Sequence, residues 1–308
     1  MSARGFSLVE TLIALVLTMV VTGTAIGLAT PAMRGASVQP EVIDVQQRAR
    51  VAAETIARDL ASAGAGMYVG ASAGVLPTTI PAVLPRRLSS VSGDGATVAR
   101  STAITLLSVP SSSSQTTIAT AISAASLSLV VNPAPNCGAA VLCGLQVGQD
   151  VLVADGAGHF DVFRITKIVG GTGTLRHHGQ TVAGTYLAGA FVTQVVSRTY
   201  EFDEVAHQLR QYDGDQSDQP SVDHLSTVAF SYWGAEAGTS RLVALPLSSF
   251  VDGPWLGAGT TSFDADLLRV RVIRITVGAE SADVNLRARV PPFVSVIDVS
   301  PRSLSVGR

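Results

Sequence analysis

One acidic side chain stands where a charge is costly. Glu10 is the only charged residue between Arg4 and Arg34, and the run around it is apolar and long enough to cross a bilayer. A carboxylate in such a segment is expensive unless a cation or a hydrogen-bond donor meets it. We therefore expect Glu10 to serve a function that involves neutralising a positive charge.

Two cysteines could form a covalent link. Cys137 and Cys143 are the only cysteines and lie six positions apart. If the chain beyond the apolar run lies outside the cytoplasm, a disulfide closing a short loop is the expected state, and two unpaired thiols are the alternative. A zinc site would need two further ligands, and no other Cys or His lies within ten residues of the pair.

Oxygen ligands alternate in one short segment. Asp213, Asp215, Ser217 and Asp218 resemble the start of a calcium loop, so calcium is a weak candidate cofactor. The EF-hand pattern has Gly where Asp218 stands, and Pro220 follows closely, so a solvated hairpin tip is the alternative. We expect no other cofactor.

No residue pattern predicts catalysis. Residues 70–74 satisfy the G-x-S-x-G nucleophile pattern, but Pro77 argues against the helix that must follow such a serine. The pair His177-His178 fits the edge of a loop better than a metal site. No acid pair or triad stands out, so we expect a protein that is not an enzyme.

The first 66 residues are dominated by helical patterns. Residues 6–33 predict a membrane-spanning helix, roughly 40 Å long at ~1.5 Å per residue. Gly35 and Pro40 predict a loosened or broken helix over residues 34–40. Beyond them the pattern is amphipathic and ends at Gly64-Ala65-Gly66; its apolar stripe is Val45, Ala49, Ala52, Ile56 and Leu60.

The pattern of the remaining chain predicts short strands. The clearest expected strands are 102–107, 127–131, 150–154, 160–168, 191–200, 225–233, 267–277 and 290–299. The apolar alternation changes phase between Val272 and Ile273, which predicts a bulge or a strand buried on both faces. We expect an α+β fold: a long N-terminal membrane-spanning helix followed by a mostly antiparallel β-sheet domain. Apolar residues make up 47% of the chain and the net charge is −2, so no nucleic-acid partner is evident.

The N-terminal motif resembles the processing site of type IV prepilins and pseudopilins. Gly5 precedes Phe6, Glu10 follows at the family's offset, and the apolar run is unbroken. The resemblance implies that a prepilin peptidase/methyltransferase cuts between Gly5 and Phe6 and N-methylates Phe6. Residues 1–5 would be the leader, 6–33 the transmembrane and assembly helix, 34–66 its amphipathic continuation, and 67–308 a periplasmic β-rich domain.

The same processing would explain Glu10 in physical terms. Cleavage creates a cationic amine at Phe6, and the acid of one subunit could neutralise the amine of its neighbour in a bundle of apolar helices. That pairing would fix the axial register between subunits, as buried polar groups do in coiled coils. The alternative interpretations are an ordinary signal peptide cut after Ala29 and an uncleaved single-span anchor.

Further segments resemble PilW-type minor pilins with less specificity. Residues 57–64 are similar to the helix end of these proteins and of J-type minor pseudopilins, and residues 148–155 with 163–168 are similar to a PilW-type hairpin. The resemblance implies a minor pilin that primes type IV pilus assembly near the tip, with major and minor pilins and inner-membrane lipid as partners. The alternative is a J-like minor pseudopilin of a type II secretion system; a membrane-tethered periplasmic adhesin or enzyme is less favoured.

Overall fold

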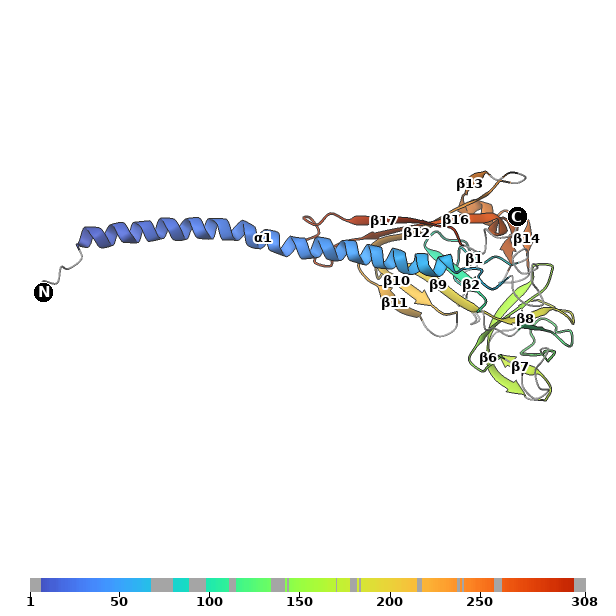
Figure 1. Ribbon diagram of the computed structural model, residues 1–308. Helices are drawn as coiled ribbons and strands as arrows, with labels where there is room; N and C mark the ends of the chain where they lie inside the picture. The colour runs from blue at the N-terminus through green and yellow to red at the C-terminus, as the bar shows by residue number, and fades with distance from the viewer. Residues whose placement is uncertain are drawn as a thin grey trace.

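The computed structural model describes most of the chain beyond the first residues. The described residues are 7–67, 80–88, 98–110, 115–133, 142, 144–169, 171–177, 182, 184–214, 218–236, 239, 241–257 and 262–301, with the backbone alone for 30–37. It is an α+β protein in which one long helix projects from a β-rich body (Figure 1).

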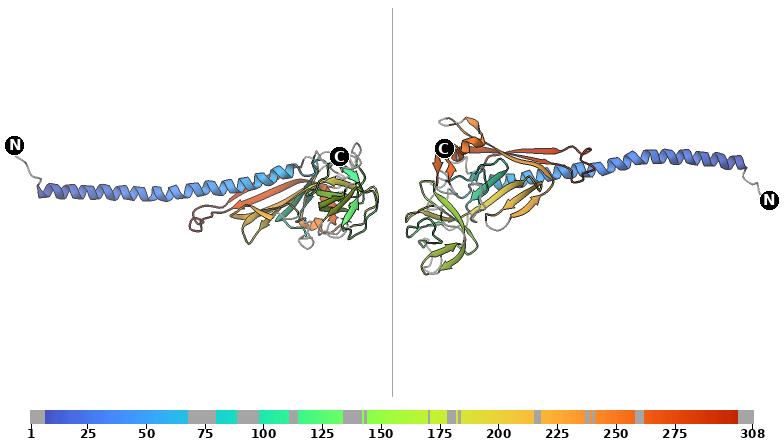
Figure 2. Two further views of the ribbon diagram at one scale, coloured as in Figure 1. Left: turned by 90° about the horizontal axis from the view of Figure 1, so that it is seen from below. Right: turned by 180° about the vertical axis from the view of Figure 1, so that it is seen from behind.

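The long helix α1 spans Leu8–Ala61, 54 residues without interruption. The predicted break over residues 34–40 is therefore wrong. Pro40 removes one backbone hydrogen bond, but Val38 and Val42 on either side of it pack against the core, and this burial holds the helical path through the proline. The helix curves gently instead of breaking (Figures 1 and 2).

Helix α1 ends close to the expected glycines. Ser62 is the C-cap, and Gly64 and Gly66 adopt φ of 72° and 75° in the turn that follows. Positive φ is a conformation that glycine adopts without steric cost, which is why the chain can turn back toward the sheet here.

Two antiparallel sheets pack against the C-terminal part of α1. One has five strands in the order β1 (Val83–Leu84), β2 (Ala103–Ser108), β9 (Val196–Asp203), β10 (Gln208–Tyr212) and β11 (Asp218–Val222). The other has four strands in the order β13 (Leu242–Leu245), β12 (Leu225–Ala235), β16 (Val270–Ala279) and β17 (Phe293–Val299).

A third sheet forms the lobe farthest from the N-terminus (Figure 1). Its order is β3 (Gln115–Thr117), β8 (Phe191–Gln194), β5 (Asp150–Ala154), β6 (Phe160–Val169), β7 (Thr174–His177) and β4 (Ser128–Val130). This lobe has its own apolar core, which includes Phe163, Tyr186 and Val192. The small elements are β14 (Trp255–Leu256), β15 (Phe263–Asp264) and the 3₁₀ helices η1 (Leu247–Phe250) and η3 (Ala265–Arg269).

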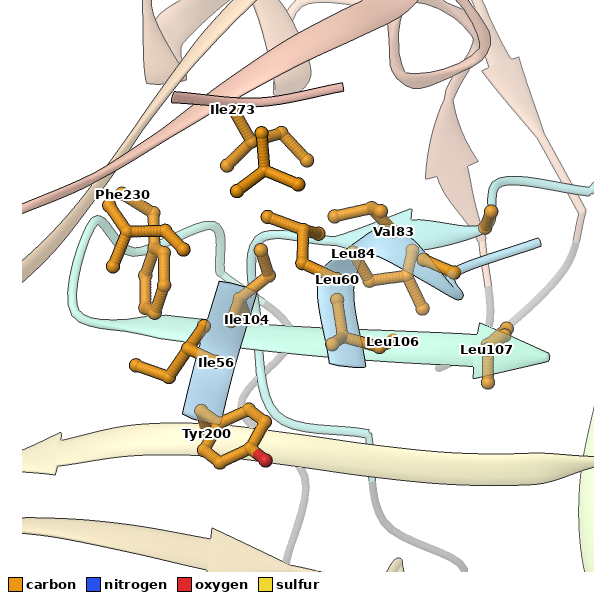
Figure 3. Close-up of a cluster of buried hydrophobic side chains, with 14 of the residues drawn as sticks. Ile56, Leu60, Val83, Leu84, Ile104, Leu106, Leu107, Tyr200, Phe230 and Ile273 are labelled. Carbon is orange, nitrogen blue, oxygen red and sulfur yellow. The ribbon is translucent and has the colours of Figure 1, made fainter. Parts of the chain in front are cut away.

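The main core lies between α1 and the first two sheets. Figure 3 shows Ile56 beside Ile104 and Tyr200, and Leu60 beside strands β1 and β2. All five residues of the predicted apolar stripe of α1 are buried, and Ala53 joins them. Because three of these side chains are alanines, the sheets can approach the helix axis closely.

Most predicted strands are confirmed, with local differences. The segment 191–200 divides into β8 and β9, which belong to different sheets, and residues 265–269 form η3 before β16 begins. The pairing of β12 with β16 shifts at Trp233/Gly234 opposite Val270 and Val272, so the phase change is a β-bulge. The list of expected strands lacks β1, β3 and β14, because two or three residues carry little periodicity, and it also lacks β7, β10, β11 and β13, which have four or five residues.

Candidate functional site

The first half of α1 is the most unusual surface of the molecule. We call Leu8–Ala29 the projecting half; it is apolar, long enough to cross a membrane, and buries none of its residues against the protein. Both views in Figure 2 show it extending away from the β-rich body. A continuous apolar surface of this size on a helix is expected to be covered by lipid or by other protein.

Glu10 lies in the first turn of this exposed helix. The N–H groups of Glu10 and Thr11 donate to the Ser7 carbonyl at 3.0 and 3.1 Å, which starts the helix there. An acidic side chain in the first turn is stabilised by the helix dipole. Gly5 and Phe6 lie outside the described residues, so their relation to Glu10 remains a prediction from the sequence.

The threonine hydroxyls of the projecting half form hydrogen bonds within the helix. Thr22 donates to the Thr18 carbonyl at 2.6 Å, Thr24 donates to the Val20 carbonyl at 3.0 Å, and Thr18 donates to the carbonyl of Ala14. Hydroxyls bonded to backbone carbonyls within the helix leave no unpaired donor toward lipid. The polar residues that interrupt the apolar run are thus compatible with a membrane.

The second half of α1, which we call the docked half (Glu41–Ala61), is anchored at its C-terminal end by Asp59. Arg198 and the Tyr200 hydroxyl of β9 both donate to the Asp59 carboxylate, the tyrosine at 2.5 Å. The hydrogen bond to Asp59 raises the pKa of Arg198, while burial and the same carboxylate raise the pKa of Tyr200. These donors offset the unfavourable position of an acid near the C-terminus of a helix.

A second carboxylate anchors the other end of the docked half. Glu41 accepts from the Ser281 hydroxyl and from the backbone N–H of Ala282, both at 2.8 Å, in the connection between β16 and β17. The Ser281 hydrogen bond is the main cause that lowers the pKa of Glu41 below 4.5. Together the two carboxylates fix how α1 lies on the two sheets.

The calcium candidates are only partly described. Asp213 and Asp218 flank the β10–β11 connection, and Asp215 and Ser217 lie outside the described residues. Asp218 accepts from Arg210 at 3.0 Å and from Arg87 at 3.2 Å, and Asp213 lies 3.6 Å from Arg164. In the described part of the chain no three His, Cys, Asp or Glu side chains gather as a metal site. Calcium stays an untested prediction.

The other candidates occupy separate places. Cys137 and Cys143 lie outside the described residues, as do residues 70–74 and His178. His177 is buried in the third sheet and stacks on Phe163, with ring centroids 4.3 Å apart. The structure therefore brings none of the described candidates next to Glu10.

The anchoring residues were missed by sequence reasoning. Arg58-Asp59-Leu60 stands out only through a family resemblance, and Asp59 meets Arg198 from a position 139 residues distant. No local spacing can reveal such a contact. The arrangement has a mechanical consequence. The β body is attached to one half of the helix, and the other half of the helix presents an apolar surface and one acid.

Comparison of the chain with protein-family models, with curated proteins and with solved structures finds no match.

Proposed function

We propose that this chain is a pilin-like assembly subunit, most similar in role to a PilW-type minor pilin of a type IV pilus. It is inserted in the inner membrane through the projecting half of α1, with its β domain in the periplasm. Its role is structural: after removal of residues 1–5 it packs by this helix among other pilins and helps to prime the filament.

One observation carries the proposal. The projecting half is exposed on every side, whereas the docked half buries its apolar stripe in the β body. A signal peptide is removed before the domain functions, so it needs no rigid continuation into the folded core. Here one uninterrupted helix joins the apolar segment to the core, which suits a segment retained for packing with other subunits.

Glu10 gives this packing its register. In a bundle of apolar helices its carboxylate would pair with the amine created at Phe6 of a neighbouring subunit. Either charge alone is costly in a low-dielectric bundle, and the pair is tolerated. The pairing therefore favours one axial offset between subunits.

The processing step is tested by mass spectrometry of protein extracted from membranes. We expect the mature chain to begin at Phe6 and to carry one added methyl group on its amine. A chain that begins at Met1 would indicate an uncleaved anchor, and one that begins at Thr30 would indicate a signal peptide; either result contradicts the proposal.

The register argument is tested by Glu10→Ala. We expect cleavage to continue, because the scissile bond is unchanged, and incorporation into filaments to fall at least tenfold, measured by immunoblot of sheared filaments against whole membranes. Glu54→Ala is the matched control, since Glu54 is an exposed acid on the docked half. Normal incorporation of Glu10→Ala would remove the register argument.

The proteins that copurify with the chain separate the two filament systems. A minor pseudopilin of a type II secretion system would undergo the same processing but copurify with secretion components. We favour the pilus role because J-like pseudopilins tend to be shorter than this chain of 308 residues.

A further inference from the structure

Strand β17 leaves a long sheet edge open. It is the last strand of the four-stranded sheet and pairs in the described structure with β16 alone, from Ile273↔Val299 to Ala279↔Phe293, without a register shift. In an antiparallel pair every second residue directs its N–H and C=O to the outer side. Such an edge is a template on which a further strand can add.

The other described edges are short or interrupted. Strands β1, β3, β4 and β13 have two to four residues, and β11 carries Pro220 and a register shift in its pairing with β10. Short edges, proline and bulges are the usual protections against strand addition. Strand β17 has seven residues and contains neither proline nor lysine, so it lacks these protections.

The two faces of β17 differ in a way that suits an added strand. Phe293 and Ile297 pack toward the core, while Val294 and Val296 on the other face are 52% and 53% exposed. The one acid of the strand, Asp298, is held by Arg274 through two hydrogen bonds of 2.7 and 2.8 Å. The outer face is therefore apolar along most of its length, with its charge already paired.

Helix α1 lies beside this edge. The guanidinium of Arg50 lies over the Phe293 ring, 5.8 Å from its centroid. In the described part of the chain no carboxylate forms an ion pair with Arg50, so an acid on the added strand would find a cation there.

We infer that the β17 edge, together with Arg50, receives an extended segment of a different subunit, with apolar residues at alternate positions and an acid opposite Arg50. A second copy of this chain does not fit. Parallel pairing of two β17 edges would need a two-fold axis along the strands, which sets the core face of one copy beside the outer face of the other. Antiparallel pairing would relate the two copies by a two-fold axis across the strands. Because β17 runs alongside α1 (Figure 1), their projecting halves would point in opposite directions, and one membrane cannot hold both. This choice of occupant rests on the proposed membrane orientation.

Hydrogen exchange of the full chain tests the inference. We compare the purified chain in detergent with the chain in isolated filaments, by mass spectrometry of peptides covering β17 and β11. Exchange at β17 should slow at least tenfold in filaments, because added backbone hydrogen bonds protect its outer amides, while exchange at β11 should not change. Val296→Lys should abolish the protection of β17, and Val205→Lys, an exposed valine in the β9–β10 turn, should leave it intact.

Each outcome is decisive for the inference. A thermal melt checks that Val296→Lys folds, and Val294→Lys, on the same exposed face of β17, provides a second variant should it not. If the chain enters filaments but β17 exchange is unchanged, or if both variants keep the protection, the inference is wrong and the proposed function stands. If β17 is protected in a detergent-solubilised dimer, the occupant is a second copy. If the chain never enters filaments, the proposed function itself fails.

Discussion

Two carboxylates fasten opposite ends of the docked half of α1. Asp59 binds Arg198 and Tyr200 of β9, and Glu41 binds Ser281 and Ala282 beyond β16. The hydrogen bonds that Glu41 accepts stabilise its charged form, so protonation of Glu41 weakens the contact. The attachment of helix to body therefore depends on pH through Glu41.

For Glu41 the direction of this dependence follows from its pKa. The folded-state pKa is lowered from 4.5, so the stabilisation by Glu41 is fully present above pH 4.5 and is lost as pH falls through the lower, folded value. We expect Glu41→Gln to be less stable than the parent at pH 7 and the difference to shrink under acid, measured by urea unfolding from pH 7 to pH 3. Glu54→Gln serves as the control. A difference that is constant over this range would contradict the assignment.

At the scale of elements, the turn after α1 decides how the helix enters the sheet. Gly64 donates its N–H to the Leu107 carbonyl at 2.7 Å, and Val109 donates to the Ala65 carbonyl at 2.8 Å. Gly66 directly follows these two residues with φ of 75°, and a Cβ there would lie 2.0 Å from the Val109 carbonyl oxygen. The turn and β2 are thus in contact at a point where only glycine fits.

This close approach makes Gly66→Ala severely destabilising. The left-handed backbone alone costs ~1–2 kcal/mol for alanine, and the clash with the backbone of Val109 adds to it, so we expect a loss above about 3 kcal/mol in denaturant unfolding. Gly148→Ala is the matched control, because Gly148 has φ of 89° and a Cβ added there would meet nothing within 4 Å. Equal losses for both variants would show that the contact with Val109 is unimportant.

At the scale of the whole molecule, α1 serves two environments. The docked half completes the core between two sheets, and the projecting half shares no core with them (Figures 1 and 2). The stability of the β body should therefore not depend on the projecting half, whereas the solubility of the chain should.

Removing the projecting half tests this division. A chain that starts at Thr30 should stay in solution without detergent and melt within about 2 °C of the full chain in detergent, because the deleted residues bury no apolar surface in the body. Circular dichroism melts and ultracentrifugation of both chains provide the measurement. A much lower melting temperature for the shortened chain would mean that the projecting half contributes to the fold.

Local patterns predicted much of the architecture. The stripe from Val45 to Leu60 follows the helical period, β5 matches its predicted bounds, and the phase change before Ile273 marked the bulge. Local rules failed at Pro40, where packing of Val38 and Val42 outweighs the proline, and at several strands of two to five residues, which are too short for a clear period.

Length, periodicity and charge are local properties, and they suffice to predict an apolar helix that bears one acid. The continuation of this helix into the core without a break, its anchoring by Asp59 and Glu41, and the position of β17 at the end of a sheet are visible only in the folded chain. Burial, ion pairing and strand order arise from contacts between distant segments, and those contacts exist only once the chain is folded.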